Sequence, residues 1–198
     1  MPNEQSNAVK ISLVLAFVAL NLTIGGIVSW LKLPIYLDSL GIVMATILLG
    51  WRNGVICAVL TVALGFVFIN PYLPFYTLTS FAIVATVEIL RRRNMYRNIG
   101  RTILSGLILA IVAAFVSAPV TAVAFGGVTA SGVDLLTALF RQTGRSLFEA
   151  VLLSGISSEP VDKVLVSVVA FLSLRGLPDR FLEEFGLRGV SELSKRTQ

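Results

Sequence analysis

Three charged side chains lie close together in a segment that is otherwise apolar enough to enter a membrane. Glu159, Asp162 and Lys163 begin a run that continues through apolar residues to Leu174. An unpaired charge inside a bilayer costs several kcal/mol, so ionisable groups at that depth face a partner or a polar cavity. We therefore expect Asp162 and Lys163 to pair with each other or to point into a binding pocket.

Further polar and aromatic side chains occur in two earlier loops, on the same predicted side of the membrane. Tyrosines there can supply flat stacking walls of a pocket, and carboxylate and amide groups its polar edges. The substrate-binding residues that we predict are Asp38, Asn70, Tyr72, Tyr76, Glu159, Asp162 and Lys163. Taken singly, each polar group is also compatible with simple hydration, and the tyrosines with an interfacial aromatic belt.

A stripe of small residues marks the first apolar segment. Ala8, Ser12 and Ala16 are spaced at i, i+4 and i+8 and share one face of a helix. Small residues let a second helix approach closely, which is a main source of helix association in lipid. The stripe either packs inside this chain or is a docking surface for a separate membrane protein.

The residue types for several other chemistries are missing. The chain has no His and a single Cys, Cys57, which argues against a transition-metal site and a disulfide framework. It also has no Walker loop, Gly-x-Ser-x-Gly or His-Glu motif. Carboxylates such as Glu88 and Glu149 have no His or Cys partner for catalysis. We expect no enzyme activity, no cofactor and no metal.

Composition places the chain in the membrane. Of its 198 residues, 56% are hydrophobic and 14% are charged, and the mean hydropathy is +0.87. Soluble domains have about 45–50% apolar and about 25% charged residues, so an ordinary soluble fold is excluded. The net charge of +5 comes from basic residues between apolar spans, and we expect no nucleic-acid partner.

The apolar segments predict one all-α membrane domain, residues 1–198, with six transmembrane helices. The fifth and sixth spans are separated by a long outer loop, in which apolar positions at helical spacing predict an amphipathic helix over 133–153. The sixth helix is expected to begin at Glu159 and Pro160, followed by a cytoplasmic tail, 175–198. The predicted spans are about 11–30, 37–50, 55–69, 75–90, 103–125 and 159–174.

The distribution of basic residues predicts the orientation. With the N-terminus inside, six spans place twelve of the 16 Lys and Arg residues inside and four outside. Cytoplasmic loops carry an excess of Lys and Arg. The chain is therefore predicted to have both termini in the cytoplasm (N-in/C-in).

Three segments of the sequence resemble those of a known family. They are KLPIYLDSLGIVMATILLG before and in the second span, NPYLPFYTLT before the fourth, and EPVDKVLVSVVAFLSLRGLP as the sixth. With six spans and the small-residue stripe, the chain resembles the S component, the substrate-binding membrane subunit, of energy-coupling factor (ECF) transporters. The family pattern has an alanine where this chain has Ser12.

The resemblance implies high-affinity uptake of a vitamin or related small micronutrient across a bacterial or archaeal cell membrane. It further implies docking through Ala8, Ser12 and Ala16 onto a transmembrane T component that carries two ABC-type ATPase subunits. The substrate's identity stays open. The alternative is a multi-span membrane sensor or scaffold module without transport activity.

Overall fold

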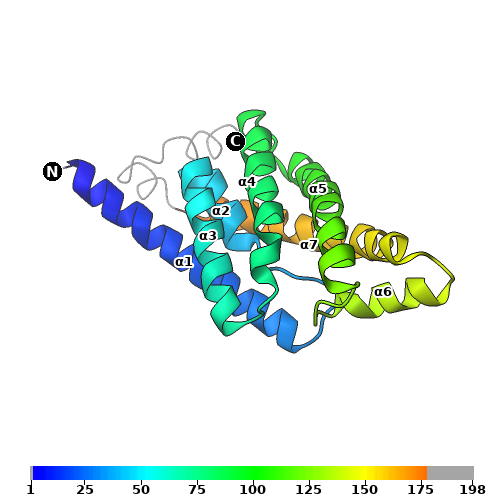
Figure 1. Ribbon diagram of the computed structural model, residues 1–198. Helices are drawn as coiled ribbons and strands as arrows, with labels where there is room; N and C mark the ends of the chain where they lie inside the picture. Colours follow the sequence, from blue (N-terminus) through cyan, green and yellow to red (C-terminus); the bar gives the residue numbers. More distant parts are fainter. Residues whose placement is uncertain (1, 178–198) are drawn as a thin grey trace.

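The computed structural model describes residues 2–177, and its regular elements are helices (Figure 1). This confirms the predicted all-α class for the described part of the chain. The predicted tail lies outside the described residues from position 178 onward. The elements are α1 (Pro2–Trp30), α2 (Leu40–Leu49), α3 (Trp51–Phe68), the 3-10 helix η1 (Leu73–Tyr76), α4 (Thr77–Arg92), α5 (Ile99–Phe125), α6 (Val133–Gln142) and α7 (Leu147–Arg175).

Within residues 2–177, four helical segments are long and apolar enough to cross a membrane. Their outer surfaces carry large exposed apolar side chains, including Phe68, which is 75% exposed, and Val123, which is 86% exposed. Such surfaces are unfavourable in water and suit hydrocarbon. The chain is consistent with a multi-pass membrane protein. The four segments are Asn7–Trp30, Trp51–Phe68, Leu73–Arg92 and Ile99–Phe125.

The short helix α2 forms the centre of the fold. It packs against α1, α3, α4 and α7, and every residue from Leu40 to Leu48 is buried. A helix that is apolar on all sides is expected in such a place. Gly41 permits the contact with α1, because a Cβ atom there would lie 2.1 Å from the carbonyl oxygen of Phe17.

Helices α5 and α7 make the most extensive contact of the bundle. Gly106 on α5 lies against the backbone of α7, where a Cβ atom would come within 2.6 Å of the Cα atom of Val164. Further along the pair, Gly155 on α7 faces Ala114 on α5. These small residues bring α7 close to α5 and set the position of Lys163.

The last helix begins earlier than the sequence predicts. The expected amphipathic helix over 133–153 ends at Gln142 as α6, and α7 begins at Leu147 and continues through Pro160. Ser146 and Glu149 form a capping box that starts α7, and this motif satisfies two backbone donors. The prediction that the helix begins at Pro160 was wrong because proline also occurs inside helices that tertiary packing stabilises.

Apart from the turn between α6 and α7, which protrudes to one side, the connections between helices gather at two ends of the bundle (Figure 1). One end, here called the linker end, has the linker 31–39, the turn before η1 and the C-terminal end of α5. The opposite end, here called the arginine end, has the turn between α2 and α3 and the loop between α4 and α5. The arginine end carries Arg52, Arg91, Arg92, Arg93, Arg97 and Arg101.

Candidate functional site

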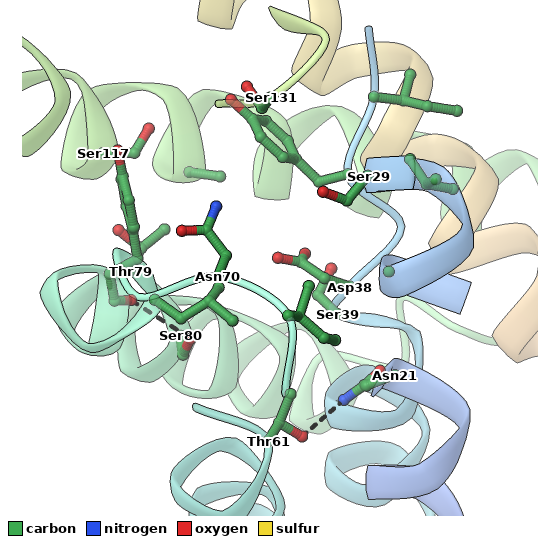
Figure 2. Close-up of a pocket in the computed structure, with 18 of the residues that line it drawn as sticks. Asn21, Ser29, Asp38, Ser39, Thr61, Asn70, Thr79, Ser80, Ser117 and Ser131 are labelled. Carbon is green, nitrogen blue, oxygen red and sulfur yellow. Dashed lines mark hydrogen bonds between the residues drawn. The ribbon is translucent and has the colours of Figure 1, made fainter. Parts of the chain in front are cut away.

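A cavity of about 140 Å³ lies at the linker end of the bundle. Residues of α1, the linker 31–39, η1, α4, α5 and α7 line it, so segments far apart in the sequence meet there. Asp38 and Asn70 project into it from the linker and from the turn before η1 (Figure 2). Its other polar lining residues include Asn21, Ser29, Ser39, Thr61, Ser80, Ser117 and Ser131.

The charged side chains of α7 form one buried group. Glu159, Asp162 and Lys163 are spaced at i, i+3 and i+4, so they lie on the same face of the helix. They are 4%, 0% and 2% exposed. The Lys163 Nζ lies 3.1 Å from Oε2 of Glu159 and also pairs with Oδ2 of Asp162. The expected pairing of Asp162 with Lys163 is present.

Asp162 also fixes the linker. The backbone N–H groups of Tyr36 and Leu37 donate to its Oδ1 at 3.1 and 2.6 Å. The linker bends sharply here, and Leu37 has a φ of 50°, a region that side-chain-bearing residues rarely adopt. The carboxylate therefore anchors the segment that presents Asp38 to the cavity.

A second irregular segment covers the same end of the cavity. Residues 126–132 meet the linker, where the Lys32 Nζ donates to the carbonyl oxygen of Ala130 at 2.6 Å. Gly132 lies so close to the linker that a Cβ atom would be 2.2 Å from the carbonyl oxygen of Leu33. Lys32 and Ala130 both have positive φ angles, 54° and 60°. Backbone strain of this kind persists only where surrounding contacts enforce it.

Two of the residues that line the cavity, Tyr72 and Tyr76, belong to an aromatic cluster around Phe125, at the end of α5. The rings of Tyr72, Phe75 and Tyr76 lie 4.7, 5.0 and 6.1 Å from its ring, centroid to centroid. The Tyr76 hydroxyl is 2.7 Å from that of Thr121. The turn before η1 is held by Asn70, whose amide donates to the Thr129 carbonyl oxygen at 3.2 Å.

The structure brings six of the seven predicted substrate-binding residues to the cavity wall. Asp38, Asn70, Tyr72, Tyr76, Glu159 and Lys163 line it. Asp162 is not a lining residue: both of its oxygens are occupied by the linker and by Lys163. Binding of a ligand by the six residues stays a prediction.

The sequence interpretation missed the contribution of α1. Asn21 is 1% exposed, and its amide donates to the Thr61 hydroxyl at 3.1 Å. Its carbonyl oxygen accepts from the Gly41 N–H at 2.6 Å. This side chain ties α1, α2 and α3 together beneath the cavity. A polar amide in the middle of an apolar span was the available signal.

The electrostatic environment of the cavity is acidic. Tyr36, in the linker, has a pKa well above its ordinary value because burial disfavours the phenolate, and the negative charge of Glu159 raises it further. Within residues 2–177 no group of three or more His, Cys, Asp or Glu side chains is arranged to hold a metal ion.

The small-residue stripe of α1 is exposed. Ala8, Ser12 and Ala16 are each exposed, as are Ala19 and Thr23 further along the same face. The Ser12 hydroxyl bonds only to the Ala8 carbonyl oxygen, at 3.0 Å. Packing within residues 2–177 therefore leaves this face free.

Comparison with known proteins gives no match: no family model, curated protein or solved structure is significantly similar to this chain.

Proposed function

We propose that this chain is the substrate-binding membrane subunit of an ECF transporter, taking up a vitamin or related small micronutrient. The observation that carries the proposal is the convergence at one cavity of the linker 31–39, the turn before η1 and the charged face of α7. These are the three segments on which the family resemblance rests.

The proposal includes six crossings. α2 is ten residues long, about 15 Å, and it forms the second crossing together with part of the linker that precedes it. α7 is 29 residues long and forms the sixth despite its charges, because these pair inside the bundle. The linker end faces the outside, and the arginine end faces the cytoplasm in agreement with the positive-inside rule.

The exposed stripe of α1 is proposed to dock onto a T component, which carries two ABC-type ATPase subunits. Ala8, Ser12 and Ala16 have no packing partner in the described part of this chain. Their side chains are small enough for the close helix contact that stabilises association in lipid. Substrate capture and energy coupling then use different parts of the molecule.

The test is co-expression with the T component and ATPase subunits of the same organism. Ala16→Trp should abolish complex formation and ATP-dependent uptake while leaving the isolated subunit folded and able to retain its ligand. Asn7→Trp is the matched control: Asn7 is also exposed but lies nine residues from Ala16, on the opposite side of α1, so complex and uptake should survive. Normal uptake by Ala16→Trp would refute the docking surface, and ligand capture without any uptake would favour the sensor alternative.

A further inference from the structure

The charged groups at the cavity are not balanced. Asp38 and Glu159 line the wall, Asp162 lies directly behind it, and Lys163 is the only cation among the lining residues. Three carboxylates against one ammonium leave two surplus negative charges in their ionised forms. In a low-dielectric setting such a surplus is costly unless a positive group compensates for it.

The ammonium of Lys163 is already paired with two carboxylates of this chain. It lies 3.1 Å from Oε2 of Glu159 and pairs with Asp162. Asp38, in contrast, points into the cavity (Figure 2), and no side chain of the described residues donates a hydrogen bond to it.

No other basic side chain reaches the cavity from the described residues. Lys32 is engaged at the outer surface with the Ala130 carbonyl oxygen and does not line the cavity. The helices α1, α4 and α5 contribute only neutral lining residues, among them Asn21, Thr79 and Ser117. The compensating positive charge must therefore come from the ligand or from protons.

The volume and the remaining lining groups limit the ligand's shape. A cavity of about 140 Å³ is close to the size of an engineered protein cavity, about 150 Å³, that binds benzene. Tyr72 and Tyr76 line it, and aromatic faces attract cations. The hydroxyls of Ser39 and Thr79, residues 2% and 9% exposed, have no hydrogen-bond partner and are free to bond polar edges of a ring.

We propose that the cavity selects an organic cation: a molecule with a single ring and a positively charged nitrogen that Asp38 and Glu159 contact. An organic cation would be the substrate class for the transport function proposed above. Uptake of the cation rests on that function. Binding itself follows from the cavity and its charges.

The test uses three ring compounds of similar size and different charge on the purified full-length protein in detergent at neutral pH. Benzylammonium should raise the melting temperature in a saturable manner, while benzyl alcohol and benzoate at the same concentrations should not. Asp38→Asn and Glu159→Gln should each raise the half-saturating concentration of benzylammonium by about tenfold or more, because each removes a charged hydrogen-bond acceptor.

The matched control is Glu149→Gln, which removes one negative charge from the exposed first turn of α7, away from the cavity. Glutamine preserves the capping box, so benzylammonium binding should be unchanged. Equal or stronger stabilisation by benzyl alcohol or benzoate, or no saturable effect of benzylammonium, would overturn the proposal. So would equal effects of Glu149→Gln and Asp38→Asn.

The two proposals fail in different ways. If the protein carries a neutral or anionic ligand and still supports uptake with its T component, transport stands and the cation class is wrong. If benzylammonium binds as described but no uptake or complex is found, the cation site stands and the transport function is wrong.

Discussion

At the residue scale, Asp162 joins α7 to the linker, because its carboxylate pairs with Lys163 and accepts the N–H groups of Tyr36 and Leu37. Its place in an apolar helix correctly indicated a buried partner, because an isolated charge there is too costly. The sequence could not reveal that the carboxylate also accepts two N–H bonds from residues more than 120 positions earlier. Contacts of that range depend on the tertiary fold, so the carboxylate was assigned to the pocket although it lies behind its wall.

Removal of this carboxylate should release the linker. Asp162→Ala leaves the N–H groups of Tyr36 and Leu37 without their acceptor and the Lys163 ammonium with Glu159 alone. Breaking a buried ion pair costs about 3–5 kcal/mol, so the melting temperature should fall. Limited trypsin digestion, analysed by mass spectrometry, should show faster cleavage after Lys32.

Glu159→Gln is the matched control for that experiment. It also removes a carboxylate from Lys163, but Glu159 makes no bond to the linker backbone, so cleavage after Lys32 should stay slow. Equal cleavage rates in the two variants would show that Asp162 does not hold the linker.

At the element scale, the helices were predictable where apolar runs are long, and their boundaries were less so. Pro160 was interpreted as a helix start, yet it lies in the interior of α7, which begins at the Ser146 capping box. The Ser-x-x-Glu signature was present in the sequence. The packing of α7 along α5, which supports the helix through its proline, was not readable from it.

The capping box makes the stability of the first turn of α7 depend on pH. The backbone N–H of Ser146 donates to Glu149 at 3.0 Å, and this bond lowers the pKa of Glu149 below its ordinary value of 4.5. A lowered carboxylate pKa contributes stability that is present above about pH 4.5 and is lost as the pH falls through the folded-state value. Amide exchange in the first turn of α7, corrected for intrinsic rates, should therefore lose protection at acidic pH.

Glu149→Gln should remove this pH dependence, because the glutamine amide does not titrate in that range. The variant should show the same protection of the first turn at acidic and at neutral pH. A similar loss of protection in both proteins on acidification would assign the effect to another group.

The contact between α5 and α7 should be sensitive to a single methyl group. Gly106→Ala places a Cβ atom 2.6 Å from backbone of α7, and overpacking of this kind costs about 1–3 kcal/mol. A lower melting temperature is expected. Gly100→Ala, on an exposed site of the same helix whose Cβ would meet nothing closer than 3.8 Å, should not lower it; equal losses would show that the close contact is not the cause.

At the scale of the whole molecule, the sequence predicted that the arginines would gather at one end. It predicted only some of the residues that line the cavity. Loop positions grouped Asp38, Asn70 and Glu159 on one side. The contributions of Asn21 and Ser117 required the packed bundle, because helix rotation decides which residues face inward. The contribution of Ser131 required the course of the irregular segment 126–132.

The orientation is directly measurable. In a Cys57→Ser background, cysteine at Gly100, at the arginine end, should react with a membrane-impermeant maleimide only after the inner face is exposed. Cysteine at Thr143, in the exposed turn after α6, should react in intact cells. Labelling of both positions from the same side would contradict the proposed six crossings.

The most direct test of the account is the amount of ligand that the cavity retains. Small molecules should be extracted from the purified protein and quantified by mass spectrometry, together with those from Ser117→Phe, which fills the cavity from α5, and Ser157→Phe, an exposed control on α7. We predict one molecule per chain in the unaltered protein and in Ser157→Phe, and none in Ser117→Phe. An empty unaltered protein, or equal amounts in both variants, would contradict the assignment of this cavity as the substrate site.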